Sequence, residues 1–265
     1  MKLSLKVSRS RLIAMGGLMA EAMSELLGTF FLLLIIFLSP VMVSSVEPFI
    51  LGTSLIALML AFGAFSKPHL NPLFTFAEYF TFIPEQISKR KFSFDKLWEL
   101  LMYLIAQFIG GITAFALAMR LQDYLINMQI EINGLTGTEG IRDQFLGQLQ
   151  YTTTYLGQFS TTVFAIEMLF SFMLAFVYLA TMVKNKNLGQ MATSVGLMVF
   201  SFTVFAANFT GASFHPFRSL VPALFTGGEA LSQVWVYLLA PVAGALFAAL
   251  AYLMLEGLRK LKKTK

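Results

Sequence analysis

Apolar residues run through this chain in blocks long enough to cross a membrane, separated by short polar segments. A helix needs about 20 apolar residues to span a bilayer. Blocks of that order predict six spans, near residues 20–42, 49–65, 97–119, 161–183, 190–210 and 232–256. Two further apolar stretches, 72–82 and 216–226, are too short to cross. The pattern therefore predicts an all-α membrane protein with six transmembrane helices and two half-helices.

Each short stretch begins with a polar side chain followed by proline. Asn71 and Pro72 open the first, and His215 and Pro216 open the second. A side chain that can accept a backbone N–H, with proline at the first helical position, is typical of a helix start. Two such starts between membrane spans predict two re-entrant helices that enter the bilayer and turn back.

The two halves of the chain repeat the same order of elements. Glu25 lies 46 residues before Asn71, and Glu167 lies 48 residues before His215. Each half reads span, span, half-helix, span. Because a half contains three spans, the second half is inverted relative to the first, and such repeats place a solute site where they meet at the midplane.

The whole chain, 1–265, is interpreted as a single transmembrane domain. Its repeats cover about 20–119 and 161–256, and residues 120–160 form the connection between them on the extracellular side.

Basic residues predict how the spans are oriented. Of the 19 Lys and Arg residues, sixteen fall on one side: Lys2, Lys6, Arg9, Arg11, Lys67, Lys89, Arg90, Lys91, Lys96, Lys184, Lys186, Arg259, Lys260, Lys262, Lys263 and Lys265. The positive-inside rule makes that side cytoplasmic. We expect a multi-pass protein of the cell membrane with both termini in the cytoplasm. The net charge of +5 then reflects topology, and no nucleic-acid partner is expected.

The segments around the two prolines resemble a known family. The matching residues are His69, Leu70, Asn71, Pro72 and Thr75 in the first segment and Pro216, Arg218, Ser219, Leu220, Pro222, Ala223 and Leu224 in the second. They are similar to the two Asn-Pro-Ala boxes of the major intrinsic protein family, the aquaporins and glycerol facilitators. The similarity covers roughly residues 20 to 257. Leu73 and Phe217 replace the two alanines, and His215 replaces the second asparagine.

This resemblance implies a passive channel for small uncharged solutes, packed as a homotetramer in the lipid bilayer. Asn71 and His215 would meet at the pore midplane, and His69 would line the approach. Glu25 and Glu167 would accept hydrogen bonds from the non-helical backbone before each half-helix; the alternative is that they relay protons. The positive ends of the half-helices would exclude ions and protons. We expect the imidazole of His215 to be neutral at pH 7.

The family builds a selectivity filter above the midplane. By alignment we place it at Thr53, Thr203, Ala212 and Arg218. Two threonines stand where water-selective members carry Phe and His, so we expect a wide filter that passes water and glycerol-like polyols. Other markers disagree: Ser219, Ala223 and Tyr237 resemble water channels, and Leu238 resembles the glycerol group.

Alternative functions remain open at this stage. The channel could be selective for water, or pass urea or hydrogen peroxide. A coupled secondary transporter also uses inverted repeats, and a closed structural protein could result if Leu73 and Phe217 plugged the pore. An enzyme is not expected, because there is no Cys, only two His, and no nucleophile-elbow, His-Glu-x-x-His or phosphate-binding glycine motif. No cofactor or metal is predicted.

Overall fold

The structure is a computed structural model that describes residues 9–42, 46–90, 92–133, 160–185 and 187–263. The described residues form helices α1 (Arg9–Met42), α2 (Glu47–Phe62), α3 (Pro72–Ser88), α4 (Phe94–Asn133), α6 (Ser160–Asn185), α7 (Leu188–Thr210), α8 (Pro216–Thr226) and α9 (Gly228–Lys263). Every predicted span and half-span corresponds to one of these helices. The all-α prediction is confirmed.

Five of the described helices, α1, α4, α6, α7 and α9, are long and apolar enough to cross a membrane. The sixth predicted span is α2, an apolar helix of 16 residues. Several helices extend beyond the predicted apolar stretches. Helix α4 continues to Asn133, so residues 120–133 of the predicted connection are helical, and α3 continues to Ser88 rather than residue 82. The rest of the connection, 134–159, lies outside the described residues.

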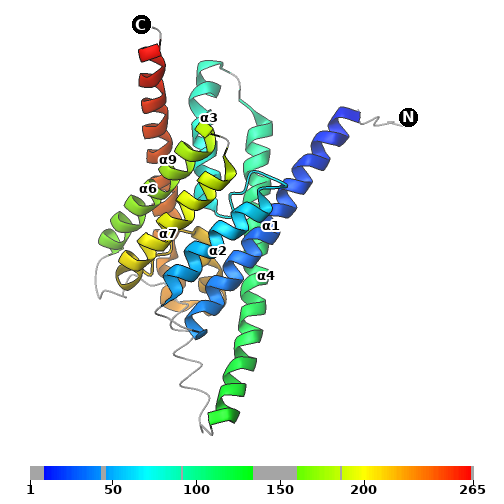
Figure 1. The fold of residues 1–265 in the computed structure, drawn as a ribbon, viewed down its shortest axis with the longest axis vertical. Coiled ribbons are helices and arrows are strands. Elements are labelled where there is room, and N and C mark those ends of the chain that lie inside the picture. The colour runs from blue at the N-terminus through cyan, green and yellow to red at the C-terminus, as the bar shows by residue number, and fades with distance from the viewer. Residues whose placement is uncertain (1–8, 43–45, 91, 134–159, 186, 264–265) are drawn as a thin grey trace.

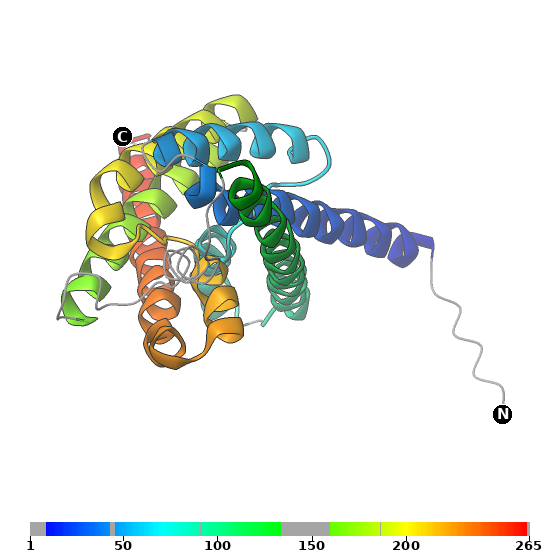
Figure 2. The same ribbon diagram turned by 90° about the horizontal axis from the view of Figure 1, so that it is seen from below.

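The first and last helices meet the surface at the same end of the molecule. Helix α1 begins and α9 ends at the top of Figure 1, which we call the inner end, and α4 ends at the bottom, the outer end. Helix α1 packs along α4, α6 along α9, and α2 along α7. Figure 2 views the bundle from the outer end. The two halves thus repeat the same pairing, in line with the predicted inverted repeat.

Glycines allow the closest of these helix pairs. A Cβ added at Gly110 of α4 would lie 2.4 Å from the carbonyl oxygen of Leu26 on α1, and one at Gly244 of α9 would lie 2.7 Å from that of Met168 on α6. Real Cβ atoms do not approach that closely. Small residues let helices approach closely, and the structure shows equivalent contacts in the two halves.

The short helices α3 and α8 begin inside the bundle. Helix α3 packs against α4, α6 and α9, while α8 packs against α4 and α9, and the two also contact each other. The segments that lead into them are non-helical. Leu70 and Phe214, each directly before a box, have left-handed backbones with φ of 53° and 46°, and so does Ala212 at 49°. This conformation is costly for residues other than glycine, so the surrounding contacts must hold it.

Candidate functional site

The two boxes meet through a reciprocal pair of hydrogen bonds. The amide Nδ2 of Asn71 donates to the carbonyl oxygen of Phe214 at 3.0 Å. In return, Nε2 of His215 donates to the carbonyl oxygen of Leu70 at 3.0 Å. Each box head therefore binds the residue directly before the other box. The left-handed backbones of Leu70 and Phe214 hold the carbonyls that accept these bonds.

Both box heads also cap their own helices. The Oδ1 atom of Asn71 accepts from the backbone N–H of Leu73 at 2.9 Å, and Nδ1 of His215 accepts from that of Arg218 at 3.3 Å. An imidazole that accepts at Nδ1 and donates at Nε2 is the neutral Nε2–H tautomer. Its single N–H is used on Leu70. Asn71, in contrast, keeps a second amide hydrogen for a solute.

Glu25 holds the loop before the first box. Its two carboxylate oxygens accept from the backbone N–H groups of His69 at 2.6 Å and Leu70 at 2.7 Å. The amide of Gln107, from α4, donates to the same carboxylate at 2.6 Å. Because Glu25 is fully buried, these donors compensate a carboxylate that would otherwise be costly in the membrane.

Glu167 does the same for the second box. It accepts from the backbone N–H groups of Ser213 at 3.1 Å and Phe214 at 2.9 Å, and from the Thr210 hydroxyl at 2.6 Å. The Tyr237 hydroxyl in turn donates to the carbonyl of Thr210 at 3.1 Å. Both glutamates therefore accept hydrogen bonds from the non-helical backbone before a half-helix.

A cavity lies on the outer side of the midplane. Its volume is about 30 Å³, which is room for one or two water molecules. It is lined by Leu32, Ile36, Leu51, Leu55, Asn71, Leu174, Val199, Ala212, Ser213, Phe214, His215 and Arg218. We call it the outer cavity. Four predicted site residues, Asn71, Ala212, His215 and Arg218, come together in it.

Thr53 does not belong to the outer cavity, and its assignment to the filter is wrong. The side chain is exposed on the outer surface of α2, and its hydroxyl donates to the carbonyl of Phe49 at 2.7 Å. Leu51 and Leu55 face the cavity from α2 instead. Two residues rotate a helix by about 200°, so an alignment error of two positions exchanges the lipid-facing and pore-facing sides.

The other predicted filter residues point into the helix bundle. Thr203 is buried, and its hydroxyl has no hydrogen-bond partner in the part of the chain that the structure describes. It lies one turn along α7 from Val199, which lines the outer cavity. The guanidinium of Arg218 donates from Nη1 to the carbonyl of Ala212 at 2.7 Å. Pro72 and Pro216 occupy the first turns of α3 and α8, as predicted.

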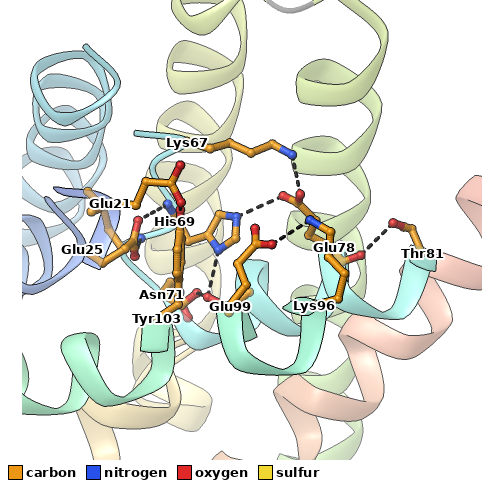
Figure 3. Close-up of polar contacts among 12 residues, drawn as sticks. Glu21, Glu25, Lys67, His69, Asn71, Glu78, Thr81, Lys96, Glu99 and Tyr103 are labelled. Atoms are coloured by element: carbon orange, nitrogen blue, oxygen red, sulfur yellow. Dashed lines mark hydrogen bonds and ion pairs between the residues drawn. The ribbon is translucent and has the colours of Figure 1, made fainter. Parts of the chain in front are cut away.

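His69 sits in a polar network toward the inner end (Figure 3). Its Nε2 lies 3.0 Å from Oε2 of Glu78, and its Nδ1 lies 3.0 Å from the Thr75 hydroxyl. The other oxygen of Glu78 pairs with the ammonium group of Lys67. The His69 ring also packs 4.8 Å from the ring of Tyr103. His69 is thus fixed on both nitrogens.

A larger cavity opens beside this network at the inner end. Its volume is about 510 Å³, and Lys67, Pro68, Glu78, Met182 and Leu188 are among its lining residues. Lys67 and Glu78 therefore face this inner cavity as a neutralised pair.

The two bulky residues that replace the box alanines do not line the outer cavity. Leu73 is fully buried in the apolar core, and Phe217 packs against Phe108 with ring centroids 5.3 Å apart. Ser219, which stands where glycerol facilitators carry Asp, is 2.6 Å from the Ser213 hydroxyl and is buried. These substitutions affect the packing of the half-helices.

The sequence did not predict several residues that line the cavities or hydrogen-bond to the loops. Leu51, Glu47, Glu78, Gln107 and Thr210 all contribute to the cavities or the loop networks. Gln107 and Glu78 could have been noticed as polar groups in apolar helices. No group of three or more His, Cys, Asp or Glu that could hold a metal occurs within the described ranges.

Two inverted box-led half-helices that meet beside one cavity are the arrangement that the resemblance implied, and sequence comparison decides the matter. The profile of the family described as "MIP: Major intrinsic protein" matches residues 12–252. The chain belongs to this family. It is a multi-pass membrane channel protein, not an enzyme.

Individual relatives agree. Glycerol uptake facilitator protein-like 6 of Lactiplantibacillus plantarum is 31% identical over 238 residues, covering 87% of this chain and 95% of the relative. Aquaporin-4 of Mus musculus is 28% identical over 203 residues, covering 76% of this chain and 53% of that protein. The X-ray structure of the aquaglyceroporin from Plasmodium falciparum superposes with a TM-score of 0.66 at 18% identity, over 89% of this chain and 95% of that one. The aquaporin fold, with its re-entrant helices, is thereby confirmed.

Proposed function

We propose that the protein is a passive channel for water and glycerol-like polyols that excludes ions and protons. The observation that carries the proposal is the outer cavity, where the box heads and Arg218 meet an apolar wall formed by residues such as Leu51 and Val199. A polyol has a carbon skeleton on one side and hydroxyls on the other. The apolar wall suits the skeleton, while Arg218, the spare N–H of Asn71 and the Thr203 hydroxyl suit the oxygens.

The filter in this proposal consists of Leu51, Thr203, Ala212 and Arg218. None of these is aromatic, which leaves more room than Phe or His would. The outer cavity, at about 30 Å³, has room for water but not for a polyol, so a polyol passes when side chains such as Leu51 change rotamer. Similarity to a protein named as a glycerol uptake facilitator supports polyols over water alone.

Exclusion of cations in this proposal comes from fixed charge. Helices α3 and α8 both point their positive N-terminal ends at the midplane, and Arg218 adds a full charge nearby. The neutral tautomer of His215 adds none. Neutral solutes feel little of this potential, whereas hydronium and metal cations are repelled.

We further propose a homotetramer in the cell membrane with both termini in the cytoplasm. The outward faces of the helices are rich in exposed apolar side chains, for example Leu197, Phe205 and Leu250, which suits contact with lipid or with neighbouring subunits. Native mass spectrometry from mild detergent measures the subunit number, and a monomer would contradict the tetramer.

Stopped-flow light scattering of proteoliposomes tests the channel directly. Water, glycerol, urea and hydrogen peroxide are each imposed as gradients, with and without a pH gradient. In a channel, the flux does not saturate with solute concentration and does not depend on the pH gradient. Saturation with proton coupling would indicate a secondary transporter, and rates equal to those of empty liposomes would indicate a closed protein. Because the chain has no cysteine, mercuric chloride should not inhibit, since it acts through thiolates.

A further inference from the structure

A carboxylate contacts the filter arginine at the outer rim of the pathway. Oε1 of Glu47 lies 3.4 Å from Nη2 of Arg218, although the two residues are 171 positions apart. The Arg218 side chain is 5% exposed and that of Glu47 is 20% exposed. The contact is thus on the solvent side of a nearly buried guanidinium.

Helix geometry places Glu47 on the pathway side of α2. Glu47 and Leu51 are four residues apart, so they lie on the same helical face. Leu51 lines the outer cavity together with Arg218. A solute that enters from the outer end would therefore meet Glu47 one helical turn before Leu51.

The guanidinium of Arg218 is held from two sides. Nη1 donates to the carbonyl of Ala212 at 2.7 Å, and Nη2 faces the Glu47 carboxylate. A planar guanidinium anchored at both terminal nitrogens has a fixed orientation. Ala212 lies in the loop directly before α8, the helix that carries the arginine, so Glu47 supplies a contact from a different helix, α2.

A simpler role for Glu47 also exists. It occupies the first turn of α2, where any acidic side chain is favoured by the helix dipole. That role needs only the charge at this position. Contact with Arg218 needs in addition the full length of the glutamate side chain, and this difference separates the two roles.

We propose that Glu47 is a positioning residue that fixes the Arg218 guanidinium across the outer filter and so determines how well the filter discriminates polyols from water. This inference rests on the proposed channel function. Without the anchor, the guanidinium loses its contact with α2 and gains freedom to move within the pathway. Glycerol, which must contact the filter on several sides, is affected more than water.

Three substitutions separate length from charge. Glu47→Asp keeps the negative charge at the helix start but is one methylene shorter and loses contact with Arg218. Glu47→Gln loses the charge but keeps an oxygen at the same reach. Glu47→Ala removes both. The matched control is Glu229→Asp, because Glu229 is an exposed acid in the first turn of α9.

The measurement is the ratio of glycerol to water permeability in proteoliposomes, with thermal stability in detergent recorded beside it. We expect the ratio to fall at least about threefold in Glu47→Asp and Glu47→Ala, the factor expected from one partly exposed hydrogen bond. Glu47→Gln and Glu229→Asp should stay close to the wild-type ratio.

The outcomes distinguish this inference from the proposed function. Wild-type rates equal to those of empty liposomes would remove the channel itself. A conducting wild type with an unchanged ratio in Glu47→Asp would overturn the positioning role. If in addition Glu47→Gln and Glu47→Ala lower stability while Glu47→Asp does not, Glu47 serves only the helix dipole.

Discussion

The first and second boxes occupy equivalent places but use different chemistry. Asn71 and His215 are both extended, both cap the helix that follows, and both donate to the carbonyl before the opposite box. An imidazole can therefore replace the box asparagine as a structural element. It cannot replace the amide as a pore donor, because His215 has no N–H left while Asn71 has one. In this sense the midplane of this channel is one-sided: Asn71 offers an N–H to a solute, and His215 does not.

The layers behind the two boxes differ in a similar way. Glu25 recruits Gln107 from α4, whereas Glu167 recruits Thr210 from the loop's own preceding helix. The first box then connects through Thr75 to the His69 network at the inner end. The backbone of the two box segments is therefore symmetric, whereas the side chains around them are not.

The largest effect is expected where the two halves are most alike. Glu25→Ala and Glu167→Ala each leave two buried backbone N–H groups and a side-chain donor without a partner. Each such group costs about 1–3 kcal/mol, so both variants should lose most of their folded population in detergent. Size-exclusion chromatography and thermal unfolding measure this, with Glu85→Ala, on the exposed part of α3, as the control. A severe loss in only one of the two would break the structural equivalence.

Exchanging the box heads tests the difference between them. Asn71→His should abolish most of the flux, because the last spare N–H at the midplane is lost. His215→Asn should raise the water flux by about threefold to tenfold, the range for one added hydrogen bond of about 1 kcal/mol. The double exchange again has one amide and one imidazole and should return toward wild type in stopped-flow assays. A double variant as inactive as Asn71→His would contradict the one-sided midplane.

The next prediction tests whether the filter beside the second box determines the selectivity between glycerol and water. Leu51→Phe should reduce glycerol flux by about tenfold while water flux changes little, since a ring at this position adds three carbon atoms to the wall of the outer cavity. Thr53→Phe is the matched control, because that side chain faces outward. Equal loss in both variants would mean that packing, rather than the pathway, was disturbed.

The smallest effect is expected in the network behind the first box. Glu78→Gln keeps an oxygen for His69 but removes the ion pair with Lys67. Partly exposed pairs contribute about 1 kcal/mol or less, so a fall in melting temperature of a few degrees is expected, with permeability ratios unchanged. Glu85→Gln, which breaks the exposed pair with Lys89 on the same helix, should cost less. A large change in solute selectivity would instead place Glu78 in the pathway.

Local sequence patterns were sufficient to predict the order of the helices within the described ranges and the starts of the half-helices. These features are local: an apolar run of a given length becomes a span, and a cap followed by proline becomes a helix start, whatever lies elsewhere. The boxes and the two supporting glutamates could be found because their spacing nearly repeats between the halves, and Arg218 because it matches the second box of the family.

Only the tertiary structure decided which side chains face the pathway. Leu51 and Thr53 lie two residues apart on one helix, and both can occur in a membrane span. The packing of α2 on α7 sets the rotation of α2, and this rotation turns Leu51 toward the outer cavity and Thr53 away from it. The tautomer of His215 depends on a carbonyl 145 residues away, and the Glu47–Arg218 pair joins residues 171 apart. Such contacts follow from how helices are rotated and docked against one another, and no local pattern in the chain encodes that rotation.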